Sequence, residues 1–162
     1  MAGGVVCRTT RWGIHFGLVP FKESEMADGT GLIKRFYTEV IGDGNLALID
    51  ELVSDDFVDH DPLPGQSPAK DGVGYFVNTM RAAFPDLKAK TTEPALVDGN
   101  LEAQYVVLTG THQGELMGVA PTGRSVEFSG VDIIRVDGGK VVEHWGATDT
   151  MTLMQQIGAV SK

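Results

Sequence analysis

Apolar side chains in the first half of the chain recur at helical spacing. Between residues 31 and 41 they fall at intervals of three and four, which is one face of a helix. The same spacing over residues 46–53 predicts a second, short helix. A third helix is expected to begin near Ser67 or Asp71 and to end before Pro85, which cannot continue it.

After Pro85 the pattern changes to strand-like runs separated by turn residues. The predicted strands are residues 87–96, 101–111, 125–136 and 140–145. A short extended segment at 57–61 precedes the third helix, and residues 151–157 are predicted to close the chain as a helix. Helices followed by antiparallel strands are typical of an α+β domain. We therefore expect a cone-shaped α+β barrel, with three N-terminal helices packed on a curved, mostly antiparallel sheet.

The length of 162 residues favours one globular domain, which we place at residues 26–162. Residues 1–25 carry no acid before Glu23 and are interpreted as a peripheral N-terminal arm. A net charge of −9 argues against binding to nucleic acid or to anionic membrane surfaces. The single cysteine, Cys7, cannot form an internal disulfide, so a cytoplasmic location is the simplest expectation.

Two ionisable residues, Asp132 and His144, interrupt apolar strands near the end of the chain. A three-residue loop at 137–139 would set Val136 opposite Lys140, and Asp132 would then face His144 across the hairpin. Directly opposed residues have Cβ atoms about 4.5–5.5 Å apart, close enough for the carboxylate to orient the imidazole and raise its basicity. In that register Gly146 leaves room for a ligand beside the pair.

Other polar and aromatic residues could join this pair in one pocket. His112 ends another predicted strand and is a third catalytic candidate. Each histidine could equally be a satisfied buried or rim residue, and Asp149 could simply cap the last helix. The candidates for substrate binding are His60, Phe128, Gly146, Asp149 and Met117.

Two common kinds of catalytic site find little support in the sequence. The histidines do not form HxH or HExxH motifs, and Asp59-His60-Asp61 is the only short-range group of possible ligands, so no metal site is predicted. No serine lies in a G-x-S-x-G motif, which argues against a hydrolase of that type. We therefore favour acid/base chemistry without a cofactor.

Several stretches of the chain resemble the SnoaL-like polyketide cyclase (ester cyclase) family of the nuclear transport factor two-like superfold. Together with the helices, they extend the resemblance over about residues 28–158. The stretches are Phe57-Val58-Asp59-His60, Gly110-Thr111-His112-Gln113-Gly114, Ala120-Pro121-Thr122-Gly123-Arg124 and Gly139-Lys140-Val141-Val142-Glu143-His144-Trp145.

The resemblance implies an apolar cavity in which cyclases of this family close a polyketide ring by intramolecular aldol condensation, without a metal or cofactor. It also implies that the acid/base aspartate of these cyclases lies two residues after the position of His144, which is Gly146 in this chain. Across the hairpin, Asp132 could restore an acid/base pair with His144. The expected partners are a hydrophobic small-molecule ligand and further copies of the chain.

Two other functions stay open at this stage. A non-catalytic carrier of small molecules could be built on the same fold. Epoxide hydrolysis on this superfold would need an arginine between two pocket acids. Arg135 is an odd number of residues from Asp132 along the strand, so it would lie on the opposite face.

A homodimer is expected because the outer face of the predicted sheet would expose apolar side chains. These side chains are Val131, Ile133, Val141 and Trp145.

Overall fold

A computed structural model describes residues 31–92 and 95–161 of the chain. The predicted N-terminal arm at 1–25, with Cys7, lies outside the described residues. Among the helices in the described ranges, none is both long and apolar enough to cross a membrane.

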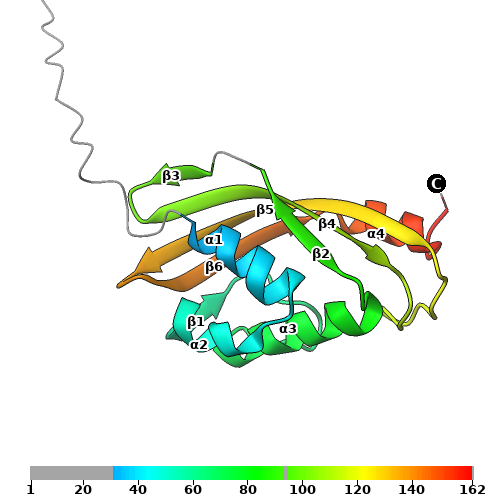
Figure 1. Ribbon diagram of the computed structural model, residues 1–162, viewed down its shortest axis with the longest axis horizontal. Helices are drawn as coiled ribbons and strands as arrows, with labels where there is room; N and C mark the ends of the chain where they lie inside the picture. Colours follow the sequence, from blue (N-terminus) through cyan, green and yellow to red (C-terminus); the bar gives the residue numbers. More distant parts are fainter. Residues whose placement is uncertain (1–30, 93–94, 162) are drawn as a thin grey trace, which may run out of the picture.

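One curved sheet of six strands forms the body of the molecule (Figure 1). The strands are β1 (Val53–Asp59), β2 (Lys88–Thr91), β3 (Leu96–Asp98), β4 (Leu101–Thr111), β5 (Ser125–Asp137) and β6 (Lys140–Thr148). The strand order is β1-β6-β5-β4-β2, and β3 also pairs with β4. All pairs are antiparallel except β1 with β6, which is parallel. The expected mostly antiparallel sheet is thus confirmed.

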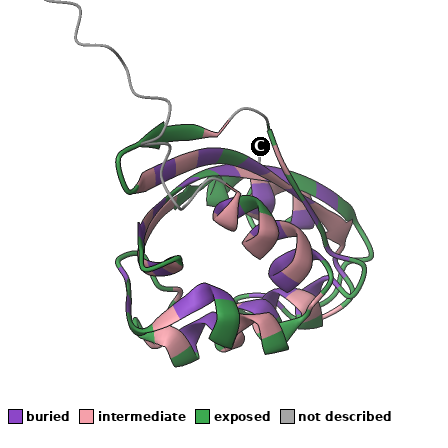
Figure 2. Cartoon of the chain, turned by 60° about the vertical axis from the view of Figure 1, so that its left-hand side comes forward, coloured by how far each residue is buried: buried purple, intermediate pink, exposed green. Residues whose placement is uncertain are grey.

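Helices cover the concave face of this sheet (Figure 2). They are α1 (Leu32–Arg35), the π-helical segment η2 (Phe36–Gly42), the 3-10 turn η3 (Leu46–Leu48), α2 (Ile49–Leu52), α3 (Lys70–Ala83) and α4 (Thr150–Ile157). The α+β fold class is therefore confirmed. Two expectations differ in detail. The first predicted helix changes to π-helical geometry at Phe36, and the expected strand at 87–96 is divided into β2 and β3.

The hydrophobic core lies between the helices and the concave face of the sheet. One face of α3 buries Val73, Val77 and Met80, while β4 and β5 contribute alternate residues such as Val106 and Phe128. Burying such a side chain contributes about 1.5–3 kcal/mol. The two periodicities, of helix and strand, thus direct one apolar face of each element into a shared core.

The predicted register of the β5–β6 hairpin is wrong. The loop contains two residues, Gly138 and Gly139, both with positive φ, as a tight hairpin turn requires. A bulge then adds Val142, so Asp132 pairs with Gly146 and His144 pairs with Ile134. Because the two departures together shift the register by two residues, Asp132 and His144 still share one face, as expected.

Candidate functional site

A cavity opens between the helices and the concave face of the sheet. Its empty volume, with open solvent at its mouth included, is about 830 Å³. Apolar side chains from α1, η2, α3, β5 and β6 form most of its wall. They include Ile33, Phe36, Val73, Phe76, Ile134 and Val141.

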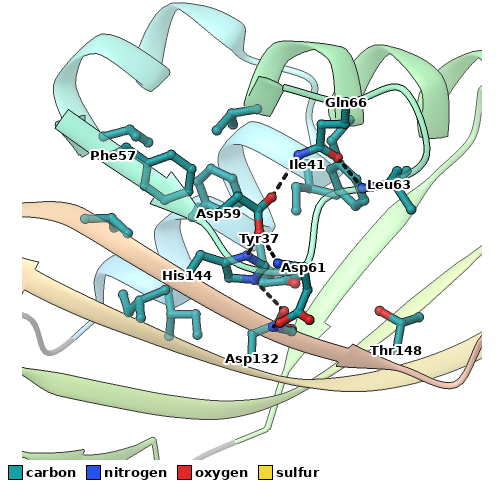
Figure 3. Close-up of a pocket in the computed structure, with 18 residues that line it drawn as sticks. Tyr37, Ile41, Phe57, Asp59, Asp61, Leu63, Gln66, Asp132, His144 and Thr148 are labelled. Carbon is teal, nitrogen blue, oxygen red and sulfur yellow. Dashed lines mark hydrogen bonds and ion pairs between the residues drawn. The ribbon is translucent and has the colours of Figure 1, made fainter. Parts of the chain in front are cut away.

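His144 lies in this cavity with a carboxylate on each ring nitrogen (Figure 3). Its Nδ1 is 2.9 Å from Asp59 Oδ1, and its Nε2 is 2.8 Å from Asp132 Oδ1. The parallel pairing of β1 with β6 sets Asp59 directly beside His144. Asp132 reaches the other side of the ring diagonally, from β5. Three strands therefore build one Asp59–His144–Asp132 network.

The network holds the imidazole in its charged form. Burial lowers the pKa of His144, but the hydrogen bonds and charges of Asp132 and Asp59 outweigh it and raise the pKa to about 9. Burial also opposes ionisation of Asp59, yet the hydrogen bond and charge of His144 leave the pKa of Asp59 below its ordinary value. At neutral pH both ring nitrogens of His144 therefore carry protons and donate them, one to each carboxylate.

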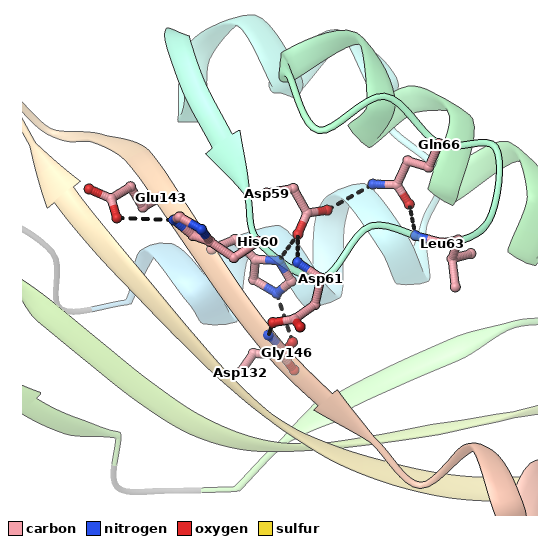
Figure 4. A network of polar contacts seen from close by, with 9 residues as sticks. Asp59, His60, Asp61, Leu63, Gln66, Asp132, Glu143 and Gly146 are labelled. Carbon is pink, nitrogen blue, oxygen red and sulfur yellow. Dashed lines mark hydrogen bonds and ion pairs between the residues drawn. The ribbon is translucent and has the colours of Figure 1, made fainter.

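A loop at residues 60–69 holds Asp59 from the opposite side (Figure 4). Asp59 Oδ1 also accepts from the backbone N–H of Asp61 at 3.1 Å, and Asp59 Oδ2 accepts from Gln66 Nε2 at 2.8 Å. Gln66 Oε1 in turn accepts from Leu63 N at 3.0 Å. These bonds fix the orientation of the carboxylate that faces His144.

Gly146 lies next to the network, and its lack of a side chain allows Asp132 and His144 to approach the backbone of β6 closely. Its backbone N–H donates to Asp61 Oδ2 at 3.0 Å, which ties the loop to β6. A Cβ atom at this position would lie 2.8 Å from Asp132 Oδ1 and 3.1 Å from His144 Cε1. A side chain at this position would therefore force the Asp132 carboxylate, which bonds His144, to shift.

Tyr37 brings a buried hydroxyl to the same wall of the cavity. Burial raises its pKa well above the ordinary value, and the charge of Asp132, a hydrogen bond to Asp132 and the charge of Asp59 act in the same direction. The phenol is therefore neutral at physiological pH and remains a hydrogen-bond donor.

The predicted pair Asp132 and His144 does line the cavity, together with Gly146. His112 does not line it. Its ring is fully buried beside Phe84, at the far end of β4, and Nδ1 lies 3.0 Å from Thr122 Oγ1. The expectation that His112 projects into the shared pocket is corrected, because β4 ends at Thr111 and the chain turns toward Thr122.

His60 also lies outside the cavity, on the outer side of β6. Its ring stacks on Trp145 with centroids 4.6 Å apart, and Nε2 is 3.2 Å from Glu143 Oε2. Alternation along β1 explains this correction. Phe57 and Asp59 face inward, so the next residue faces outward.

Three further substrate-binding candidates do not contact the cavity either. Phe128 is buried in the core against Phe84. Asp149 caps α4 by accepting from Thr152 N at 2.9 Å, as its alternative interpretation held. Met117 is half exposed at a turn with positive φ.

Sequence reasoning missed Asp59, Tyr37 and Gln66 as residues of the site. A signal existed for Asp59, because it shares the parity of the apolar Phe57 in an extended segment. Tyr37 was assigned to an apolar helix face, where nothing marks its hydroxyl as functional. Gln66 lies in a loop whose path the sequence does not define.

Among residues 31–92 and 95–161, no group of three or more histidine, cysteine, aspartate or glutamate side chains is arranged to hold a metal ion. The polar groups of the cavity instead hydrogen-bond one another. What the arrangement offers chemically is a carboxylate held beside a cation in an apolar space, which suits proton transfer to and from carbon or oxygen.

The chain is similar in sequence and fold to known and proposed cyclases. The nogalonic acid methyl ester cyclase of Streptomyces nogalater is 28% identical over 112 residues, which are 68% of this chain and 83% of the cyclase. The structure of IdmH, a proposed polyketide cyclase from Streptomyces antibioticus, is 34% identical with a TM-score of 0.66, covering 78% of this chain and 96% of IdmH. A proposed polyketide cyclase from Bacillus cereus is 28% identical with a TM-score of 0.70, covering 80% of each chain.

A family-wide comparison extends this similarity over most of the domain. The SnoaL-like polyketide cyclase family matches residues 31–157, a range that contains β1 to β6 and the helices from α1 to α4. The chain therefore belongs to the SnoaL-like polyketide cyclase family.

Proposed function

We propose that this protein is a cofactor-free cyclase that closes a ring in a hydrophobic carbonyl compound by acid/base catalysis. The observation that carries the proposal is the Asp59–His144–Asp132 network in the wall of an apolar cavity. Ionisable groups are costly to bury unless they are paired. A chain that retains three of them here gains a positioned acid/base group for its ligand.

Asp132 is the catalytic base in this proposal. His144 cannot accept a proton at neutral pH, because both of its ring nitrogens already carry one. Asp132 lines the cavity, and the neighbouring Gly146 has no side chain to cover it. His144 keeps Asp132 ionised and oriented, and Asp59 balances the second N–H of the imidazolium.

The reaction then proceeds in two proton transfers that balance. Asp132 removes a proton from the carbon next to a carbonyl, and the C–H electron pair forms the enolate. The enolate carbon attacks a second carbonyl of the same molecule, a C–C bond forms, and the C=O π bond opens to an alkoxide. The Asp132 carboxyl returns its proton to that alkoxide, which regenerates the base.

The position of Gly146 supports this assignment. The resemblance places the acid/base aspartate of the cyclases at residue 146, and the Cα partner of Gly146 across the hairpin is Asp132. A carboxylate from β5 can therefore reach the space that a carboxylate on β6 would occupy. The name of the Streptomyces nogalater relative suggests an esterified polyketide as the first substrate to try.

The proposal is tested with nogalonic acid methyl ester and the Asp132→Asn variant. The amide has nearly the same volume but no charge, so we expect kcat to fall about 10²–10⁴-fold while thermal unfolding changes little. Activity should need no added cofactor and survive treatment with a chelator. Asp98→Asn, which changes an exposed acid at the end of β3, is the matched control and should keep full activity. Full activity of Asp132→Asn would overturn the assignment.

Two alternative functions, a non-catalytic carrier and an epoxide hydrolase, predict different results. Stoichiometric binding of the ester without turnover would favour the carrier. Epoxide hydrolysis on this superfold would need an arginine between two acids. Here the cation between two acids is His144, so this activity is tested in a second assay. Arg135 itself is on the other face of the sheet and donates to Glu143 Oε1 at 3.2 Å. Diol formation from a hydrophobic epoxide would favour this second activity.

We also propose that the protein assembles as a homodimer or higher homo-oligomer through the outer face of the sheet. Tyr105 and Val131 are directly paired there, and Ile133 is paired with Trp145. Val141 does not belong to this face, contrary to expectation, because the two-residue loop pairs it with the inward-facing Val136, and it lines the cavity.

A further inference from the structure

Tyr37 lies in a segment whose helical geometry is unusual in proteins. The segment η2, Phe36–Gly42, is π-helical, and the N–H of Asp43 reaches back five residues to the carbonyl of Thr38. Such segments are rare and occur frequently at functional sites. This one forms part of the cavity wall and carries Tyr37 at its second residue.

The Tyr37 side chain shares the cavity wall with the carboxylate that the proposed reaction uses. It is buried, and the nearby charge of Asp132 contributes to the rise in its pKa. Figure 3 shows it beside the network, on the side that faces the helices. Burial and an acidic neighbourhood keep the phenol protonated, so it retains an O–H to donate.

Other donors in the cavity wall are engaged elsewhere. Both N–H groups of His144 are bound by carboxylates, and the Gln66 amide donates to Asp59. Thr148 has a hydroxyl, but it lies at the end of β6, apart from the network (Figure 3). The Tyr37 hydroxyl is therefore the side-chain donor best placed for a ligand oxygen beside Asp132.

We propose that Tyr37 is a second catalytic residue, whose hydroxyl donates a hydrogen bond to the enolate oxygen that forms when Asp132 removes the substrate proton. This inference rests on the proposed cyclase function. In the empty site the hydroxyl lies in the same cavity wall as the Asp132 carboxylate. Once Asp132 is protonated, the nearby enolate oxygen is the stronger acceptor, and the hydroxyl turns to it without losing its own proton.

This role would offset the repulsion between the enolate and the negative charges that line the cavity. The carboxylates of Asp59, Asp61 and Asp132 line it, with His144 as the only cation among the lining residues. An enolate formed in such surroundings needs a neutral donor, because a positioned hydrogen bond stabilises developing charge most where water is excluded. Tyr37 supplies that donor, and no added cation is needed.

The first test is the Tyr37→Phe variant, which removes one oxygen and keeps the ring in the wall. With nogalonic acid methyl ester we expect kcat to fall about 10²-fold with little change in KM, as for the loss of one oxyanion donor. Tyr75→Phe is the matched control, because Tyr75 is exposed on α3 and does not line the cavity. An unchanged kcat in Tyr37→Phe would overturn the proposal.

A second measurement tests the role of Tyr37 independently of whether the proposed reaction occurs. The carbonyl stretching frequency of the bound ester is recorded by infrared difference spectroscopy in Asp132→Asn and in Asp132→Asn/Tyr37→Phe. We expect a lower frequency where Tyr37 is present, because its hydroxyl polarises the substrate carbonyl. Equal frequencies would overturn the proposal. This measurement needs no turnover, so it decides the role of Tyr37 even if the ester is bound and not cyclised.

Discussion

Asp132 and Gly146 are direct Cα partners across the β5–β6 hairpin, and a Cβ atom on Gly146 would lie 2.8 Å from Asp132 Oδ1. Such a contact is shorter than carbon and oxygen atoms accept, so the carboxylate would have to move. Its hydrogen bond to His144, at 2.8 Å, would be the first interaction to change. The smallest residue on β6 and the acid on β5 therefore depend on each other.

We expect Gly146→Ala to reduce activity by at least about tenfold, since small misplacement of a catalytic group is costly. The His144 pKa should also fall, because a displaced Asp132 stabilises the imidazolium less. Steady-state kinetics and NMR titration of the His144 ring measure the two effects. Gly74→Ala is the control, because a Cβ atom there meets nothing within 4 Å. If Gly146→Ala keeps both activity and pKa, the proposed dependence is wrong.

Removing the other carboxylate should also shift the titration of His144. In Asp59→Asn the imidazolium loses a charged acceptor at Nδ1, so the pKa of about 9 is expected to fall toward or below its ordinary value of 6.5. Ring proton shifts followed by NMR from pH 5 to 10 report the change. His60 serves as an internal control, because it contacts Glu143 on the outer side of β6. A midpoint unchanged from that of the wild type would contradict the network.

The stability of the folded protein should fall as the pH rises from neutral to alkaline. The pKa of His144 is higher in the folded state, about 9, than its ordinary value of 6.5. Its contribution is therefore complete below about pH 6.5 and is lost as the pH rises through 9, by at most about 3 kcal/mol. Chemical denaturation at a series of pH values measures this. The decline between pH 6.5 and 9 should be much smaller in His144→Gln, and an equal decline would refute the attribution.

The outer face of the sheet predicts self-association. Val131 and Tyr105 are nearly half exposed as a direct cross-strand pair, next to Ile133. Exposed apolar patches of this kind usually mark interfaces. Sedimentation at micromolar concentration should show a dimer or larger species, and Ile133→Lys should shift it toward the monomer of 17.3 kDa. A wild-type protein that sediments as a monomer would count against the interface.

The elements of this fold follow closely from its hydrophobic periodicity. Residues 101–111, predicted as a strand, are β4 without change of either boundary. The π-helical geometry of η2 could not be anticipated, because its apolar spacing fits an α-helix equally well. The break between β2 and β3 was missed for a related reason. Local composition is strand-like throughout, and pairing with β4 decides where each strand stops.

The alternation of side chains between the two faces of a strand determined which site residues could be predicted. Asp132 and His144 were placed on one face, although the assumed register was wrong, because the shorter loop and the bulge at Val142 preserve their relative parity. The shorter loop alone reverses Val141, by pairing it with Val136, so its assignment to the outer face failed. Alternation with Phe57 could place Asp59 on the inner face, but its contact with His144 could not be predicted. That contact depends on the parallel pairing of β1 with β6, and a parallel pairing between distant segments has no local signature.

The parallel pairing of β1 with β6 also has a consequence for the order of folding. Asp59 and His144 are 85 residues apart in the chain, so their contact carries a large loop-closure entropy and contributes to a high contact order. During synthesis, β1 leaves the ribosome long before its neighbour in the sheet exists. The nascent chain must therefore extend through β6 before β1 can be paired, and the site is completed only then.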